Sequence, residues 1–492
     1  MPLQTTCRRR KRSFGKLFDL TKGYPRWSAF IAIVAFGSCT YALINLLFSR
    51  FSLYEDATQR PHSKTHLRIL RDTTYSIIEQ QPQIKNYNEF SLDSHHNISF
   101  AYSKNWVGFP NFPTINCRLP LSYPTLNRQY PAKVNRVYPT DFTAEARDCQ
   151  AFVGKYGFCR HPEVLQEELD FPIAFILLFH ADLDQVVFLL RAIYRPHNVY
   201  CLFVDTKSSV DFLEATRAVA KCLPNVFLSS KLESIVYAGY SRLLADIHCL
   251  RDLVNHPVKW KYVINSPGQA FPLRTNLEMV RILKLFNGTN DIEAKTGTGR
   301  KMERYTYKYE YIRNHTSGEV VLNKTQIKHS PPPHRLEIVK CSVYASLSRA
   351  FVEFLLTSQI AKDLLEWAKP VFSPDELYWA TLNYNSVVPA PGGFRGVPAR
   401  RTWLASISLW DTDKEMKCVT KYVRGICILT PGDLPTLMKR YELFANKFHI
   451  DHYPAALHCL DQLIYNLTFS RTVRDMDYYE SRNLSTGRRL RH

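Results

Sequence analysis

The sequence lacks the glycine-rich loops with which many α/β proteins bind nucleotide phosphates. Four apolar stretches in its central part read as strands: PIAFILLFH (172–180), NVYCLFVD (198–205), NVFLSS (225–230) and KYVINS (261–266). None of them is followed by a Walker A sequence or by G-x-G-x-x-G. Because such loops bind phosphates through their backbone N–H groups, this absence excludes nucleotide binding by a glycine loop.

A D-x-D motif directly after a strand is also missing. The second strand ends in 204–207, VDTK, where only Asp205 is acidic, so the second carboxylate of a metal-binding pair is absent. Other D-x-D triplets occur where a solvated surface is the ordinary explanation, at Asp182–Asp184, Asp411–Asp413 and Asp475–Asp477. We therefore expect no metal and no other cofactor.

Residues 28–49, SAFIAIVAFGSCTYALINLLFS, carry no charge. A helix of that length spans about 33 Å, enough to cross a bilayer core. Residues 1–26 contain eight Lys/Arg and one acid, Asp19, a run that could indicate nucleic-acid binding. The apolar segment after it argues otherwise, and the basic run beside that segment places the N-terminus in the cytosol. A cleaved signal peptide is the alternative, but no clean A-x-A site follows. We therefore expect a transmembrane signal anchor at 27–49 behind a cytosolic basic tail, 1–26.

Two patterns agree with a luminal body. Ten of the twelve cysteines follow residue 49, which suits an oxidising compartment, with buried free thiols as the alternative. Six N-x-S/T sequons, each a weak motif alone, also follow the span: Asn97, Asn287, Asn314, Asn323, Asn466 and Asn483.

Strand and helix patterns alternate four times from residue 172. This predicts an α/β fold of the Rossmann type, with a mostly parallel sheet flanked by helices. Ligands bind beyond the carboxyl ends of such strands, where His180, Asp205 and Ser266 lie. We expect a luminal stem and lead-in at 50–145, a catalytic domain at 146–470 containing a long ordered loop at 287–335, and a basic C-terminal tail at 471–492.

The segment Phe372–Thr381, FSPDELYWAT, admits two interpretations. In the first, Ser373 caps a helix, Pro374 occupies its first position and Glu376 completes a capping box. In the second, Glu376 is a general base that takes a proton from an incoming hydroxyl. These ten residues alone favour the cap.

The chain resembles the core 2 and I-branching β-1,6-N-acetylglucosaminyltransferases, glycosyltransferase family 14. Eight stretches carry the resemblance in order over about 350 residues: FPIAFILLFH, RAIYRPHNVYCLFVD, NVFLSSKLESIVYAGYSRLLAD, KYVINSPGQAFPLRTNLE, PPP at 331–333, FSPDELYWAT, YVRGICILTPGDL and LFANKF. The resemblance implies a GT-A-like fold and a type II Golgi enzyme that transfers a sugar from a UDP-sugar to O-glycosylated glycoproteins.

The resemblance also implies roles for individual residues. Glu376 falls on the family's catalytic base, and Arg424 and Lys447 would meet the diphosphate charge without a metal. Asp205 and Tyr237 would line the donor pocket. Asp375 is expected to be a first-turn acid favoured by the helix dipole. Acceptor contacts would come from Glu293, Lys301, Arg304 and Trp410, with Trp403 as the alternative stacking residue.

The resemblance implies four disulfides, which sequence alone could not choose: Cys117–Cys459, Cys149–Cys222, Cys201–Cys249 and Cys418–Cys427. Cys159 and Cys341 are left over, and they could pair, stay free or join a second chain in a homodimer.

Two positions depart from the family pattern, at Ala270 in place of an acid and at Thr412 in place of an aromatic. They leave the donor sugar open between N-acetylglucosamine and glucose or another hexose. The expected activity is β-1,6 branching of Galβ1-3GalNAc, the core 1 O-glycan. Peptide O-xylosyl transfer and an inactive luminal glycan-binding protein are the alternatives.

Overall fold

The computed structural model describes residues 134–295, 301–394, 403–413, 418–482 and 484–485, and seven residues of the lead-in: 106, 108–110, 112, 115 and 117. All of them belong to one compact unit, Ile98–His492. Within this described part of the chain, no helix is long and apolar enough to cross a membrane. The anchor expected at 27–49, the basic tail before it, and Asn97 and Asn483 lie outside the described residues.

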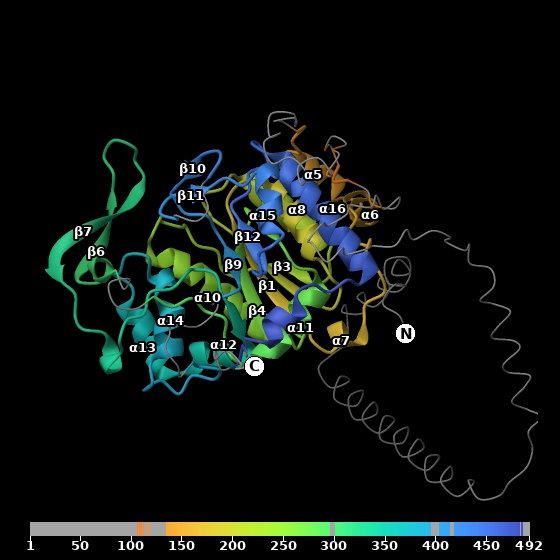
Figure 1. The fold of residues 1–492 in the computed structure, drawn as a ribbon. Coiled ribbons are helices and arrows are strands. Elements are labelled where there is room, and N and C mark those ends of the chain that lie inside the picture. The colour runs from red at the N-terminus through yellow and green to blue at the C-terminus, as the bar shows by residue number, and fades with distance from the viewer. Residues whose placement is uncertain are drawn as a thin grey trace, which may run out of the picture. The chain divides into compact units, whose positions relative to one another are not determined.

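A five-stranded sheet forms the centre of the domain (Figure 1). Its strands lie in the order β3 (Val226–Leu228), β2 (Val199–Val204), β1 (Ile173–Phe179), β4 (Tyr262–Pro267) and β8 (Ser346–Ser348). The first four are parallel and β8 is antiparallel to β4. The mostly parallel sheet predicted from the alternating pattern is therefore present, and the carboxyl ends of β1, β2 and β4 share one edge.

The sheet is buried on both faces, which explains why its strands are apolar along their whole length. Along β1, Phe175 and Leu177 enter one core, whereas Ala174 and Ile176 enter the other. The first core is completed by α8 (Leu183–Ile193), α9 (Val210–Lys221), α11 (Asn276–Phe286) and α16 (Pro454–Ser470). The second is completed by α10 (Tyr240–Asn255), α12 (Arg349–Thr357), α13 (Gln359–Trp367) and α14 (Tyr378–Tyr384).

Shorter elements surround this framework. A three-stranded sheet has the order β5 (Ala270–Pro272), β12 (Phe444–Asn446) and β9 (Ser406–Ile407), and a two-stranded hairpin consists of β10 (Tyr422–Val423) and β11 (Ile426–Cys427). The remaining helices are α5 (Pro139–Glu145), α6 (Cys149–Tyr156), α7 (Gln166–Leu169), α15 (Leu434–Leu437) and α17 (Met476–Glu480), with 3-10 turns η5 (Met302–Arg304), η6 (Pro333–Arg335), η7 (Pro374–Glu376) and η9 (Pro431–Asp433).

The insertion at 287–335 is not the long loop that we expected. Its described part contains an antiparallel hairpin, β6 (Tyr307–Arg313) and β7 (Val320–Lys328), which projects beyond α13 and α14 (Figure 1). Its alternating aromatic and polar residues, YKYEYIR, favour a strand. The hairpin is tied to the domain where Tyr309 donates its N–H to the carbonyl of Pro370 at 2.8 Å.

The packed core continues beyond residue 470, where we expected a tail to begin. The Arg474 guanidinium pairs with the fully buried Glu278 at 2.8 Å. Arg274, 1% exposed, donates to the hydroxyl of Tyr479 at 2.8 Å and pairs with Asp475. These contacts attach α17 to α11.

The described residues contain the four expected disulfides, Cys117–Cys459, Cys149–Cys222, Cys201–Cys249 and Cys418–Cys427. Cys341 is a buried free thiol, so the possible pair between Cys159 and Cys341 does not form. The sequon at Asn466 is unsuited to glycosylation, because Asn466 is only 5% exposed within α16 and its side chain is not accessible to a glycan. Asn287 and Asn314 are exposed and Asn323 is half-buried.

Candidate active site

The carboxyl end of β2 is organised by Asp205. Its Oδ1 accepts hydrogen bonds from the backbone N–H groups of Lys207 at 3.0 Å and Ile235 at 3.2 Å. The Lys207 ammonium donates in turn to the carbonyl of Ile235 at 2.5 Å. Asp205, 9% exposed, therefore fixes the loop 229–239, which connects β3 to α10, against the end of β2.

The loop 229–239 joins the residues expected to bind the donor to those expected to act on the acceptor. Tyr237 is 68% exposed, and the Arg424 guanidinium lies over its ring, 5.1 Å from the centroid. The next residue, Ala238, accepts the backbone N–H of Ser373 at 2.7 Å. Arg424 and the segment before Glu376 therefore both contact neighbouring residues of one loop.

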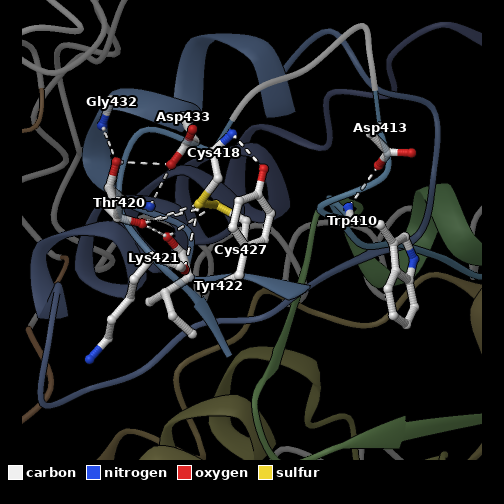
Figure 2. The surroundings of a disulfide bond; sticks show 11 residues. Trp410, Asp413, Cys418, Thr420, Lys421, Tyr422, Cys427, Gly432 and Asp433 are labelled. Atoms are coloured by element: carbon white, nitrogen blue, oxygen red, sulfur yellow. Dashed lines mark hydrogen bonds between the residues drawn. A yellow bond between two sulfur atoms is a disulfide. The ribbon is translucent and has the colours of Figure 1, made fainter. Parts of the chain in front are cut away.

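Arg424 stands at the tip of the β10–β11 hairpin. Arg424 and Gly425 both have positive φ, 54° and 76°, as a two-residue type I′ turn requires. Figure 2 shows the disulfide Cys418–Cys427 closing the base of this hairpin, with the Tyr422 hydroxyl accepting the N–H of Cys418 at 3.2 Å. The cross-link therefore holds the backbone that presents Arg424.

Lys447 lies beside this hairpin, directly after β12. Its carbonyl accepts the N–H of Leu429, the second residue after β11, at 2.8 Å. Burial lowers the pKa of Lys447, and the charge of Arg424 lowers it further, so the two cations are close enough to repel each other. Neither forms an ion pair with a carboxylate in the part of the chain that the structure describes. Two adjacent cations with no counterion suit an anionic ligand.

The capping-box interpretation of Phe372–Thr381 is wrong. Ser373 adopts a left-handed conformation with φ 50°, and its side chain caps nothing. Residues 374–376 form the 3-10 turn η7, and α14 begins only at Tyr378. The backbone N–H of Ser373, which a capping Glu376 would accept, donates instead to Ala238. The Glu376 carboxylate is therefore free of a capping role.

The Glu376 carboxylate instead faces two cations. Its Oε2 lies 2.5 Å from Nη1 of Arg304 and 3.2 Å from Nζ of Lys340, and its side chain is 23% exposed. Burial opposes ionisation, but the charges of Lys340 and Arg304 outweigh it, so the pKa of Glu376 lies below its ordinary value. Glu376 is therefore ionised, partly accessible and able to accept a proton.

Asp375 lies in a first turn, as we expected, but this is the short 3-10 turn η7 and its side chain is buried. It is 5% exposed, and its Oδ2 lies 4.0 Å from Nε of Arg242 on α10. That guanidinium is bound more closely, at 2.7 Å, by Asp246. The other oxygen of Asp375 is buried without a hydrogen-bond partner. Burial therefore raises the pKa of Asp375 to about 6, although Arg242 opposes the shift.

The residues predicted to contact the acceptor are only partly brought together. Arg304 contacts Glu376 directly, whereas Glu293 pairs with Lys295 at 3.1 Å. Lys301 is exposed, with φ 56°. Sequence reasoning missed Lys340, because nothing in the local sequence IVKCS marks it as a site residue. Its proximity to Glu376 arises from a long-range backbone contact, in which the N–H of the next residue, Cys341, donates to the carbonyl of Glu376 at 2.6 Å.

Trp410 lies next to the Arg424 hairpin. It is 44% exposed and forms a β-bridge with Ile426, and its backbone N–H donates to the Asp413 carboxylate at 2.7 Å. Figure 2 shows its indole directed away from the disulfide. Trp403, in contrast, has a buried indole nitrogen. An exposed indole of this kind can stack on a sugar face, so Trp410 suits that role better than Trp403.

The two departures from the family pattern lie in different surroundings. Ala270 is fully buried in β5, opposite Asn446, the neighbour of Lys447. Thr412 is exposed, two residues after Trp410. The departure at Ala270 therefore lies in the buried layer next to Lys447, whereas the departure at Thr412 lies on the surface near Trp410.

The D-x-D triplets have structural partners. Asp182 and Asp184 both bind Arg136, at 2.8 and 2.6 Å, and Asp475 binds Arg274. Asp413 accepts the N–H of Trp410. Among the described residues, no group of three or more His, Cys, Asp or Glu side chains has the arrangement of a metal site.

Several known proteins similar to this chain are named as β-1,6-N-acetylglucosaminyltransferases. The family profile "Branch: Core-2/I-Branching enzyme" matches residues 173–438. An N-acetyllactosaminide beta-1,6-N-acetylglucosaminyl-transferase of Mus musculus is 39% identical over 335 residues, 67% of this chain and 81% of the relative. Its Homo sapiens counterpart is 40% identical over 331 residues, which are 66% of this chain and 80% of the relative. A human Beta-1,3-galactosyl-O-glycosyl-glycoprotein beta-1,6-N-acetylglucosaminyltransferase 3 is 36% identical over 66% of this chain and 75% of the relative. The chain therefore belongs to the Core-2/I-branching enzyme family.

Proposed function

We propose that this protein is an inverting β-1,6-glycosyltransferase that transfers a sugar, N-acetylglucosamine in the first instance, from a UDP-sugar to a glycan acceptor. One observation carries the proposal: the Glu376 carboxylate is released from helix capping and lies ionised and partly accessible between Arg304 and Lys340. The names of the relatives, all β-1,6-N-acetylglucosaminyltransferases, agree with this chemistry.

The reaction is a single displacement at the anomeric carbon of the donor. Glu376 accepts the proton of the acceptor C6 hydroxyl as its oxygen forms the new glycosidic bond. The bond from the anomeric carbon to the diphosphate breaks, and the electron pair leaves with UDP. Arg424 and Lys447 stabilise the charge that develops on the diphosphate, which removes the need for a metal. Tyr237 and Asp205 shape the donor side.

The acceptor in this proposal is a glycan with an accessible C6 hydroxyl. Core 1 O-glycans, Galβ1-3GalNAc, are the first choice, and N-acetyllactosamine chains are the second because two of the named relatives act on them. Glu293, Lys301, Arg304 and Trp410 lie on the acceptor side. We further propose a Golgi location, with the span at 27–49 anchoring a luminal enzyme.

A transfer assay with radiolabelled UDP-sugars tests the proposal. The full chain in detergent is offered UDP-N-acetylglucosamine, UDP-glucose, UDP-galactose and UDP-xylose with each glycan acceptor and with a serine-containing peptide, with and without EDTA. We expect transfer to the glycan, unaffected by EDTA. Transfer of xylose to the peptide would replace the proposal, and loss of transfer with EDTA would remove its metal-free part.

Glu376→Gln is the matched test of the base. It keeps the shape of the side chain but cannot accept the proton, so kcat should fall by about 10²-fold or more while UDP affinity stays nearly unchanged. Asp211→Asn, an exposed change on α9, is the control and should keep full activity. Turnover that survives in Glu376→Gln would show that another group is the base. Absence of transfer from any donor by the wild type would favour an inactive glycan-binding protein.

A further inference from the structure

The two oxygens of the Glu376 carboxylate have different surroundings. Oε2 receives both cations, Arg304 at 2.5 Å and Lys340 at 3.2 Å. Oε1 makes no hydrogen bond or ion pair with the residues that the structure describes. A base must leave one lone pair accessible to the hydroxyl that it deprotonates. The arrangement therefore identifies Oε1 as the oxygen that can accept the proton.

Lys340 is held in place on both sides. Its backbone forms an antiparallel bridge with Lys295, with N–H to O distances of 2.7 and 3.3 Å between the heavy atoms. Its ammonium also donates to the carbonyl of Cys341 at 3.0 Å. The N–H of Cys341 in turn donates to the carbonyl of Glu376 at 2.6 Å. Lys340 and Glu376 are therefore fixed to each other through the backbone as well as through the ion pair.

Lys340 is better suited to a fixed contact than to binding a substrate. Its side chain is 16% exposed, less than the 23% of Glu376 and the 54% of Lys295. An ammonium at that depth loses much of its hydration, so it is retained only where it has a partner. Glu376 is the only carboxylate paired with it among the described residues.

We propose that Lys340 is a positioning residue for the base. By sharing Oε2 with Arg304, it directs Oε1 to the acceptor hydroxyl and favours the ionised form of Glu376. The inference rests on the proposed function, because it assigns Lys340 a part in the same proton transfer. Arg304 alone would leave the carboxylate free to rotate about one contact, whereas two donors on one oxygen fix its plane.

Several groups besides Lys340 face Glu376 and bear on its protonation. They are Arg304, Asp375, Cys341 and Tyr344, which lie on the elements packed around Glu376. Burial opposes the charge of Glu376, and Lys340 is the largest of the influences that lower its pKa. Asp375 also titrates within the pH range of an activity profile, since burial raises its pKa to about 6. An experiment must therefore separate Glu376 from Asp375.

The test is the pH profile of kcat/KM for Lys340→Met, which keeps the unbranched shape and most of the length of the side chain and removes its charge. Lys340→Arg restores the charge, and Lys155→Met, which breaks a surface pair with Glu145, is the control. Each change is made in the wild type and in Asp375→Asn, between about pH 3.5 and pH 8, so that the profile includes the acid limb of Glu376. We expect Lys340→Met to move the acid limb upward by about one pH unit in both backgrounds, and Lys340→Arg to move it back.

The outcomes separate this inference from the proposed function. An acid limb that stays in place in Lys340→Met, or that moves only where Asp375 is present, would overturn the role of Lys340 while leaving the transferase intact. If the wild type transfers no sugar, the proposed function fails first. A double-mutant cycle of Lys340→Met and Glu376→Gln in urea unfolding then tests the pair itself. A coupling energy between the two changes that is larger at about pH 7 than at about pH 4 supports the role of Lys340. A coupling energy that is absent, or equal at the two pH values, overturns that role.

Discussion

Asp375→Asn should stabilise this protein at neutral pH, although it removes a charge next to the proposed base. Asp375 is 5% exposed, one of its oxygens has no partner, and Arg242 lies 4.0 Å away because Asp246 binds it more closely. Burial therefore raises its pKa from 3.8 to about 6. Because the folded-state pKa lies above the unfolded value, ionised Asp375 lowers the free energy of unfolding. This cost is complete above about pH 6 and disappears below about pH 4.

The magnitude follows from the size of this shift. About two pKa units correspond to about 3 kcal/mol, and an asparagine amide recovers part of it because it stays neutral but loses the attraction to Arg242. We expect Asp375→Asn to raise the unfolding free energy by about 1–2 kcal/mol at pH 7.5 and to leave it nearly unchanged at about pH 3.5.

Urea unfolding at the two pH values measures this difference. Asp211→Asn, an exposed aspartate on α9, is the matched control and should change the unfolding free energy by less than about 0.5 kcal/mol at either pH. Destabilisation by Asp375→Asn at pH 7.5, or an effect of the same size at both pH values, would refute the reasoning. Asp375 would then act as a paired ion rather than as a poorly compensated buried acid.

Two further changes test other parts of the structure. Arg424→Ala should weaken UDP binding by about tenfold or more, as measured by calorimetry, because it removes a charge-assisted contact to the diphosphate; unchanged affinity would place Arg424 outside the site. Arg474→Met should lower the unfolding free energy by about 3–5 kcal/mol in urea titration, since it leaves the carboxylate of Glu278 buried without its partner; a change below about 1 kcal/mol would show that water reaches Glu278.

The central sheet was predictable from sequence for a simple reason. Strands buried on both faces must be apolar along their whole length, and the helices between them carry one apolar face. The order of strands and helices can therefore be predicted from short stretches of sequence. The antiparallel edge strand β8 was less visible, because Ser346–Ser348 is short and polar. The β6–β7 hairpin was missed because the insertion as a whole is polar and rich in lysine, although YKYEYIR within it alternates as a strand does.

The family resemblance proposed Glu376, Arg424 and Lys447 as site residues, but it could not give their contacts. The loop 229–239, which contacts both Arg424 and Ser373, is not distinctive as a sequence. Its role depends on the ends of β2 and β3 and on the hairpin closed by Cys418–Cys427, which come together only in the folded domain.

The sequence by itself determined the α/β class, the four described disulfides through resemblance, and the identity of the residue proposed as the base. Only the tertiary structure decided what surrounds that base. Capping is a contact between near neighbours and looked sufficient from the sequence, yet the left-handed Ser373 prevents it. Arg304 and Lys340 reach Glu376 from 72 and 36 residues away. Contacts between residues so far apart in sequence depend on how the chain packs, so no local sequence pattern predicts them.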